Sequence, residues 1–214
     1  VTPDAVEFEK GGKTESVSAE KVLLSIGRRA RTRDIGLETI GVLLDRGKIV
    51  TDEYMKTNIP GVYATGDVNG KIMLAHTAYR ETEVAINNML GKRDIMRYDA
   101  IPSVIYTNPE VGSVGLTEKA AKDAGYDIAV VKTPMAYSGR YIAEGGGDGI
   151  CKLVVDKKYN RLLGVHVIGN YASEFIVAAS ILVETQMRID DIKELVFPHP
   201  TVCEIIREAI FQLK

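Results

Sequence analysis

The segment GICKLVVDKKYNRLLGVHVI, residues 149–168, contains two apolar runs with a polar turn between them. The runs cover 149–156 and 162–168, and Lys157-Lys158-Tyr159-Asn160 forms the turn. Runs rich in Val, Leu and Ile are typical of β-strands, and so short a connection joins strands that lie antiparallel. We therefore expect this segment to form a hairpin of an antiparallel sheet.

Further strands and helices surround this hairpin in the sequence. The pattern predicts strands at 103–106, 111–115 and 127–133, and helices at 118–123, 172–184, 189–195 and 201–212. These elements predict an α/β chain whose last domain is of the α+β kind, an antiparallel sheet with helices packed on one face. The helix at 172–184 is apolar around most of its circumference, so we expect a second subunit, in a homodimer, to cover part of it.

Two less regular regions precede this domain. Residues 1–26 suggest short strands, including the apolar run 22–26, and they are too few to bury a core alone. Residues 27–98 contain a basic loop, a strand at 62–65 and a helix from about 74 to 90. The sequence thus predicts three parts, 1–26, 27–98 and 99–214.

Composition and charge restrict the classes of function. Apolar residues make up 45% and charged residues 26%, as in ordinary globular proteins. The net charge of -2 gives no electrostatic reason to expect nucleic acid or an acidic membrane as partner. No apolar run reaches the ~18 residues that cross a bilayer. Two cysteines without CxxC spacing and the lack of a signal peptide predict a cytoplasmic protein, and Val1 in place of Met suggests that the chain begins inside a longer one.

The strand at 62–65 ends in Gly66-Asp67, a pattern that can hold a ligand. Glycine lets a ligand approach the backbone, and an ionised aspartate accepts hydrogen bonds from sugar-type hydroxyls. By the pattern alone, a plain turn that ends the strand is the simpler interpretation. Just downstream, Met73-Leu74-Ala75-His76 opens the long helix, and the free N–H groups there favour an anionic ligand atom. We expect the backbone donors to matter more than the imidazole of His76, which the pattern places as a partly buried helix residue.

The run Phe197-Pro198-His199-Pro200-Thr201 holds a histidine between two prolines, just before a helix. Prolines restrict the backbone, and a rigidly held histidine suits general acid–base chemistry. Glu204 has two interpretations of equal weight. It can orient the imidazole of His199, or it can complete a T-x-x-E capping box with Thr201.

Other polar or reactive residues predict no site by themselves. Cys151 and Cys203 are interpreted as small core residues, and His166 as a packed or surface residue of a strand. The arginines from Arg28 to Arg33 can bind a phosphate, but a solvated loop is the simpler interpretation. The glycine-rich stretch 144–149 matches neither GxxxxGK[ST] nor GxGxxG and is expected to be a loop. No metal site is predicted.

Taken in order, these motifs resemble the C-terminal half of the dihydrolipoamide dehydrogenases, within the family of dimeric flavoprotein disulfide reductases. The resembling stretches are Ser25-Ile26-Gly27-Arg28-Arg29, Tyr63-Ala64-Thr65-Gly66-Asp67, Met73-Leu74-Ala75-His76, Tyr106-Thr107-Asn108-Pro109-Glu110-Val111 and His199-Pro200-Thr201 with Glu204. The resemblance implies that 1–26 ends an NAD-binding domain, that 27–98 contacts FAD and that 99–214 is the interface domain.

The resemblance also implies roles for single residues. Gly66 and Asp67 would hold FAD, with Asp67 at the ribityl chain, and the backbone of Met73, Leu74, Ala75 and His76 would face the flavin. Gly27 would lie beside the NAD site. His199, oriented by Glu204, would act as the base toward a lipoyl thiol in the active site of the partner subunit.

The implied activity is oxidation of dihydrolipoyl groups through a redox disulfide and FAD to NAD, on a lipoyl-bearing protein of a 2-oxo acid dehydrogenase complex. Both GxGxxG fingerprints and the CxxxxC redox pair are missing from this sequence, so we expect the chain alone to be inactive. A glutathione or mercuric type of disulfide reductase is an alternative. The mercuric type is disfavoured because the tail 210–214 lacks a cysteine pair. A non-catalytic, stand-alone dimerisation fragment is the alternative from another class.

Overall fold

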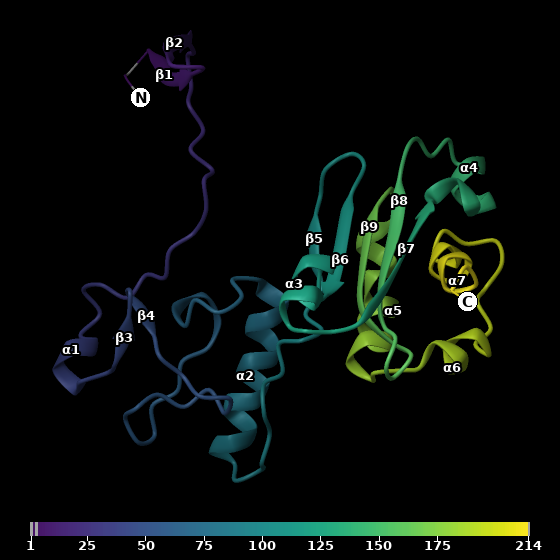
Figure 1. Cartoon of the computed structure of the whole chain (residues 1–214). Coiled ribbons are helices and arrows are strands. Elements are labelled where there is room, and N and C mark those ends of the chain that lie inside the picture. The colour runs from purple at the N-terminus through teal and green to yellow at the C-terminus, as the bar shows by residue number, and fades with distance from the viewer. Residues whose placement is uncertain (1, 3, 214) are drawn as a thin grey trace.

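A computed structural model describes residue 2 and residues 4–213, and its largest unit is a five-stranded antiparallel sheet (Figure 1). The strands are β5 (Ser103–Ile105), β6 (Val111–Gly115), β7 (Ile128–Pro134), β8 (Ile150–Asp156) and β9 (Arg161–Ile168), in the order β5-β6-β9-β8-β7. The hairpin expected at 149–168 is β8 and β9, which lie next to each other near the middle of the sheet. The prediction of an antiparallel sheet is confirmed.

Helices cover both faces of this sheet, although not equally. On one face, α5 (Ala172–Glu184) packs against β6 and β9, and α7 (Glu204–Ile210) packs against β7 and β8, with α6 (Ile189–Lys193) beside α7. The short helix α3 (Glu118–Asp123) contributes Ala121 to a smaller apolar cluster with Val154 and Leu163. Those side chains belong to the other face, because Leu153, Val155 and Leu162 lie in the main core. The larger helices thus lie on one face as predicted, and α3 adds partial cover to the opposite one.

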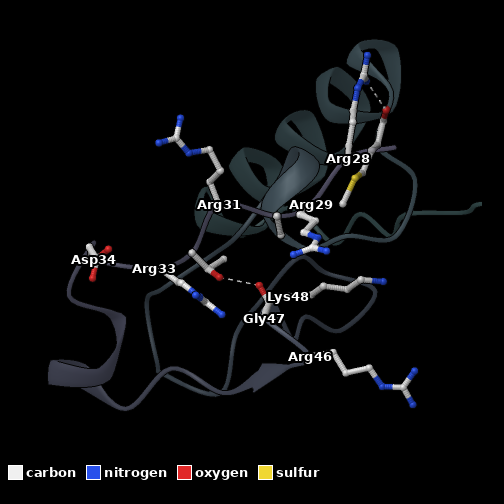
Figure 2. A pocket seen from close by; sticks show the side chains of 11 residues that line it. Arg28, Arg29, Arg31, Arg33, Asp34, Arg46, Gly47 and Lys48 are labelled. Carbon is white, nitrogen blue, oxygen red and sulfur yellow. Dashed lines mark hydrogen bonds between the residues drawn. The ribbon is translucent and has the colours of Figure 1, made fainter. Parts of the chain in front are cut away.

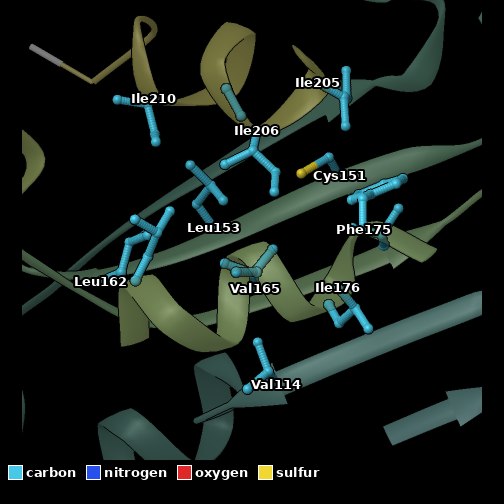
Figure 3. Close-up of a cluster of buried hydrophobic side chains, with 14 of the residues drawn as sticks. Val114, Cys151, Leu153, Leu162, Val165, Phe175, Ile176, Ile205, Ile206 and Ile210 are labelled. Carbon is cyan, nitrogen blue, oxygen red and sulfur yellow. The ribbon is translucent and has the colours of Figure 1, made fainter. Parts of the chain in front are cut away.

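The main core lies between the sheet and these larger helices (Figure 3). Cys151, Leu153 and Val165 of the sheet meet Ile176 of α5 and Ile206 of α7 there, and each of these five side chains is buried. The strands alternate between this face and the other, as the two-residue period of a β-strand requires. A shift of register between Val154 and Val155 interrupts that alternation. It lets Leu162 face the main core while the adjacent Leu163 faces α3.

Gly115 and Gly164 lie opposite each other in the antiparallel pair of β6 and β9. A methyl group on Gly115, whose φ is 74°, would overlap the carbonyl oxygen of Leu163. A methyl group on Gly164 would overlap the carbonyl oxygen of Leu116 in the same way. The two glycines therefore allow the backbones of these strands to approach more closely than side chains permit.

One helical segment of this domain is not predicted by the sequence pattern. Residues 135–143 form the 3₁₀ turn η2 (Met135–Tyr137) and the helix α4 (Gly139–Ala143). The stretch 137–141 was expected to be a polar loop, but Tyr141 is buried and Met135 is completely so. The Ser138 side chain accepts a hydrogen bond from the Tyr141 N–H and caps the helix.

Residues 27–98 are organised around one long helix, α2 (Ala75–Met89), close to the predicted range. Around it lie α1 (Leu37–Ile40), the short hairpin β3 (Leu44–Asp45) and β4 (Lys48–Ile49), and the 3₁₀ turn η1 (Gly66–Val68). Two small apolar clusters stabilise this part, one around Met55 and Val84 and one around Val42 and Ile49. The strand expected at 62–65 is reduced to a single bridge between Lys56 and Tyr63.

The N-terminal hairpin lies well apart from the rest of the chain (Figure 1). Its strands β1 (Ala5–Lys10) and β2 (Lys13–Ser18) are joined by the turn at Gly11 and Gly12, both with positive φ. The run 22–26, expected to be a strand, is extended and pairs with no other described residue. Leu23 and Ile26 there are 90% and 87% exposed. The strand prediction at 22–26 is therefore wrong for this structure. A strand needs a neighbouring strand to pair with, and the apolar pattern of one run does not tell whether such a neighbour exists.

Candidate functional site

His199 and Glu204 form a hydrogen-bonded pair at the start of α7. The Nδ1 atom of His199 lies 2.9 Å from Oε1 and 3.1 Å from Oε2 of Glu204. The imidazole is 78% exposed, whereas the Glu204 side chain is only 15% exposed. Among the described residues Nε2 of His199 has no hydrogen-bond partner, so this nitrogen is free to exchange a proton with a bound group.

Glu204 also binds the backbone of the loop that carries the histidine. The Thr201 N–H donates to Oε2 of Glu204 at 2.8 Å. This bond, followed by the bond to His199, holds the pKa of the Glu204 carboxyl below its usual range. The Thr201 hydroxyl instead donates to the Pro198 carbonyl, and α7 begins at Glu204 itself. Both interpretations of Glu204 therefore describe real contacts: it meets the imidazole and it makes the carboxylate half of a capping box.

Ser138 joins the loop of His199 to the rest of the domain, and no sequence pattern identifies this serine as important. Ser138 is buried, and its hydroxyl donates to the Thr201 carbonyl at 3.0 Å while it caps α4. The bond joins residues that are far apart in the chain. The loop before α7 is thus held at both ends of Thr201, through its N–H by Glu204 and through its C=O by Ser138.

Gly66 and Asp67 form a second group of candidate residues, in η1. Gly66 is buried with a φ of 77°, and a methyl group there would come within 3.3 Å of the Ala78 side chain of α2. The Thr82 hydroxyl reaches from α2 to the Thr65 hydroxyl at 3.1 Å. Asp67 is exposed, and its carboxylate has no hydrogen bond to another described residue. The turn is therefore packed tightly on α2 while its carboxylate is available to a ligand.

The predicted segment Met73, Leu74, Ala75 and His76 leads into α2, with Leu74 as the N-cap residue in extended conformation. No acceptor among the described residues takes the N–H groups of Ala75 and His76, so these donors are available to an anionic atom. His76 was expected to be partly buried but is exposed, and its Nε2 lies 2.7 Å from the Pro102 carbonyl. Its ring is thus occupied by a backbone contact, and the free donors of this segment come from the backbone.

A cavity of about 590 Å³ lies beside this segment, next to the predicted Gly27 (Figure 2). Asp34 is the one acidic residue of its lining. The basic residues of the lining are Arg28, Arg29, Arg31, Arg33, Arg46 and Lys48. Arg28 donates to the Met73 carbonyl at 3.1 Å and so connects the basic loop to the start of α2. Figure 2 shows the guanidinium groups of Arg28, Arg31 and Arg46 pointing in different directions. The cavity is strongly positive without a convergent set of donors.

The structure does not bring the two groups of candidate residues together within one chain. In Figure 1 the sheet lies between α2 and α7. Because η1, which contains Asp67, packs on α2 and His199 precedes α7, the two groups are on separate parts of the molecule. Cys151 is buried in the main core and Cys203 packs against it, as expected of small core residues. His166 is half-buried between Ser113 and the Leu116 carbonyl, and burial lowers its pKa.

The described residues contain no group of three or more His, Cys, Asp or Glu side chains arranged to hold a metal ion. Among the helices described, none combines the length and apolarity needed to cross a bilayer.

Comparison with known proteins supports the arrangement seen in the structure. The model of the pyridine nucleotide-disulphide oxidoreductase dimerisation domain matches residues 101–210, and that of the pyridine nucleotide-disulphide oxidoreductases matches residues 1–82. A dihydrolipoyl dehydrogenase of Thermus scotoductus is 42% identical over 205 residues, which are 95% of this chain and 44% of that protein. A mitochondrial dihydrolipoyl dehydrogenase of Sus scrofa is 39% identical over 206 residues, 96% of this chain and 40% of that protein.

Solved structures show the same fold. LpdA from Mycobacterium tuberculosis superimposes with a TM-score of 0.88 at 23% identity, over 99% of this chain and 48% of that one. The flavoprotein disulfide reductase RclA from Escherichia coli, in a Cu(II) complex, gives 0.87 at 24% identity, over 100% of this chain and 48% of that one.

The chain spans less than half the length of the dihydrolipoyl dehydrogenases that it matches. Its match to the dimerisation domain covers the sheet, the helices α3 to α7 and the loop of His199. On this match the chain belongs to the pyridine nucleotide-disulphide oxidoreductase family.

Proposed function

We propose that this chain is the C-terminal part of a dihydrolipoyl dehydrogenase, in which residues 27–98 contact FAD and residues 99–214 form the interface domain. The observation that carries the proposal is the pair of His199 and Glu204, with Nδ1 held by the carboxylate and Nε2 free. Similarity to dihydrolipoyl dehydrogenases over nearly the whole chain supports the same activity.

The geometry of the pair suits the removal of a proton from a thiol. With Nδ1–H donating to Glu204, the lone pair of neutral His199 lies on Nε2, which faces away from the carboxylate. A dihydrolipoyl S–H gives its proton to Nε2, and the resulting imidazolium lies between the thiolate and the ionised Glu204. A thiolate is the form of sulfur that attacks a disulfide. Glu204 remains ionised in this role because the Thr201 N–H and His199 both favour its charged form.

Residues 27–98 fit a flavin nucleotide in three respects. Asp67 offers an exposed carboxylate to hydroxyl groups, and the start of α2 offers free N–H groups to an anionic edge. The basic cavity beside Met73 would attract the phosphates of a dinucleotide, FAD or NAD, through its positive charge. When bound, FAD supplies two-electron transfer between a dithiol–disulfide pair and NAD. Within this proposal Gly66, Asp67, Met73, Leu74, Ala75 and His76 contact FAD and Gly27 lies at the NAD site.

A homodimer is part of the proposal, because Asp67 lies in η1 against α2 whereas His199 precedes α7, beyond the sheet (Figure 1). The family model that matches residues 101–210 is a dimerisation domain. On α5, Val177 and Ile181 are each 56% exposed and lie one turn apart, which gives the helix an apolar stripe on its outer side. A second copy that covers this stripe would place His199 of one subunit at the flavin side of the other. The physiological partner would be a lipoyl-bearing protein of a 2-oxo acid dehydrogenase complex, in the cytoplasm.

The test uses a chimera in which this chain replaces the matched segment of the Thermus scotoductus dihydrolipoyl dehydrogenase. We expect the chimera to bind FAD and to reduce NAD with dihydrolipoamide as donor. The His199→Ala variant should lose about 10²- to 10⁴-fold in kcat, because the base is absent, whereas FAD binding should be unchanged. His166→Ala, which removes a histidine of the same domain away from α7, is the matched control.

Other outcomes of this test separate the alternatives. Oxidation of NADH or NADPH with glutathione disulfide or Hg²⁺ as electron acceptor, and no activity with dihydrolipoamide, would assign the chain to another disulfide reductase. A dimeric chimera that binds FAD but has no reductase activity would leave only a dimerisation function. Equal kcat values for the wild type and His199→Ala would show that His199 is not the base.

A further inference from the structure

Glu81 is a completely buried glutamate in the middle of α2. Its exposed fraction is 0%, although the helix also carries exposed charges such as Glu83, two residues away. The burial comes from the chain's own elements: α2 itself, η1 and the segment that contains Tyr98. Burying an ionised carboxylate costs several kcal/mol unless hydrogen bonds replace the lost water. A glutamate at this position therefore calls for an explanation by its partners.

Three donors meet the carboxylate of Glu81. The Gly66 N–H donates to Oε2 at 2.6 Å, and the Asn69 side-chain amide donates to the same oxygen at 2.9 Å. The Tyr98 hydroxyl donates to Oε1 at 2.7 Å. Asn69, like Glu81, is buried. Two of the three donors thus belong to the four residues from Gly66 to Asn69, which include Asp67.

Tyr98 completes the network from outside η1. Burial, and next the hydrogen bond to Glu81, raises the pKa of the Tyr98 hydroxyl, which keeps it a donor at every physiological pH. The ammonium of Lys71 lies over the Tyr98 ring, 5.2 Å from its centre. Tyr98 also packs against the cluster of Met55 and Val84. The tyrosine is therefore a fixed point for Oε1, and Oε2 is left to fix the turn.

We propose that Glu81 is the positioning residue of the flavin-contacting turn, holding the Gly66 N–H so that the Asp67 carboxylate is presented to the cofactor. The proposal rests on the proposed function, because that function assigns Asp67 to FAD. Gly66 has a φ of 77°. Glycine can adopt several backbone conformations, so a strong hydrogen bond to the Gly66 N–H selects this one. Asp67 follows immediately, and the direction of its side chain is set by that selection.

Substitutions at Glu81 separate the effects of shape and charge. Glu81→Gln has nearly the same shape: its amide oxygen can accept from Gly66 and Asn69, and its NH₂ can donate to the Tyr98 oxygen. Glu81→Ala leaves the Gly66 N–H, the Asn69 amide and the Tyr98 hydroxyl without their buried acceptor. Glu83→Gln, on the same helix at an exposed position, changes the same charge outside the network and is the matched control.

The experiment measures FAD affinity in the chimera described above, by titration of the FAD-free protein followed through flavin fluorescence. Circular dichroism first establishes a temperature at which every variant is folded. We expect Glu81→Ala to weaken FAD binding by about 100-fold or more and Glu81→Gln by about 10-fold or less, with Glu83→Gln unchanged. Tyr98→Phe, which removes one donor only, should fall between Glu83→Gln and Glu81→Ala.

The outcomes are distinct. A purely structural Glu81 would lower the unfolding temperature and leave the affinity of the folded protein for FAD unchanged, which would overturn the proposal. The Glu81→Gln and Tyr98→Phe variants answer the question even where Glu81→Ala does not fold, since equal affinity in both and in the wild type also overturns it. A wild-type chimera that binds no FAD would instead overturn the proposed function together with this role of Glu81.

Discussion

Glu204 serves two partners with one carboxylate, the imidazole of His199 and the Thr201 N–H. The first contact orients a group for chemistry, and the second shapes the backbone that holds this group. A substitution at Glu204 therefore alters the loop as well as the imidazole. His199, by contrast, is largely exposed, and its replacement leaves the Thr201 contact in place. The two residues of the pair differ in how cleanly their chemistry can be isolated.

We predict that Glu204→Gln lowers the stability of the chain at neutral pH and has a smaller effect in acid. The pKa of Glu204 is lowered in the folded protein, chiefly by the Thr201 N–H. A lowered carboxyl pKa stabilises the fold above the ordinary pKa of glutamate, and this stabilisation is lost as the pH falls through the folded value. Urea denaturation of the wild type and of Glu204→Gln, at neutral and at acidic pH, measures the difference in their free energies of unfolding.

Glu208→Gln, on the same helix with its carboxylate bound to the half-buried Arg207, is the control for a general charge effect. A Glu204→Gln deficit of the same size at neutral and acidic pH would contradict the prediction.

At this scale the sequence reveals residues whose identity is unusual in its local setting. His199 stands between two prolines, and Asp67 follows a strand and a glycine, so both are visible as candidates. Ser138 and Glu81 are not, because their importance comes from contacts with Thr201 and Gly66 across the fold. No local pattern marks a serine that binds a carbonyl distant in the chain. Glu81 also looks like any charged residue of an amphipathic helix until its burial is known.

The neighbouring strands β6 and β9 contact each other through a pair of glycines instead of larger side chains. Gly115 lies opposite Gly164, and each would bring a methyl group into a carbonyl oxygen of the other segment. The Leu116 N–H bonds to the Leu163 carbonyl at 2.8 Å just beside them. The backbones of β6 and β9 therefore lie close together at these glycines, just before the chain enters α3.

We predict that Gly115→Ala destabilises the chain by about 3 kcal/mol or more, because the new methyl group forces the two backbones apart. Gly125→Ala is the matched control, since Gly125 has a similar φ of 81° but no atom within 4 Å of the added carbon. That control should cost only the backbone strain, about 1 kcal/mol. Thermal unfolding of both variants gives the comparison, and equal losses would show that conformation, not contact, limits Gly115.

Elements with their own periodic pattern are predicted well from this sequence, and elements that depend on a neighbour are not. The hairpin of β8 and β9 and the helices α2 and α5 lie where the apolar pattern indicates. The helix α4 was missed because five residues are too few for a period, and its start is set by the cap at Ser138. The run 22–26 has the composition of a strand but lacks a described partner.

The whole molecule has its apolar core concentrated in the last domain. One large cluster joins the sheet to α5, α6 and α7, whereas the part before it contains two small clusters. The N-terminal hairpin is connected by an exposed extended segment (Figure 1). Stability therefore differs along the chain, highest in the part that contains the five-stranded sheet and lowest in the segment after the hairpin.

We predict that brief trypsin digestion cuts the chain first between 20 and 32, at Lys21, Arg28, Arg29 or Arg31, which are all exposed. Proteases act on exposed and flexible backbone before they act on folded elements. Mass spectrometry of the products should show loss of the N-terminal hairpin and an intact remainder that ends at the original C-terminus. First cuts within the interface domain, for example at Lys152 or Arg161 of the sheet, would show that its core is less stable than the segment.

The exposed run 22–26 affects the mass that this chain shows in solution. Its apolar side chains lie beside peptide groups that bond to no other described residue, so one copy can add to another edge to edge. Association through α5 in the proposed homodimer would stop at two copies, because a twofold contact uses up its own surface. Edge pairing has no such end point and grows with concentration. A sedimentation profile of the chain should therefore combine a saturating dimer with an open-ended series, and only the first reports on the proposed homodimer.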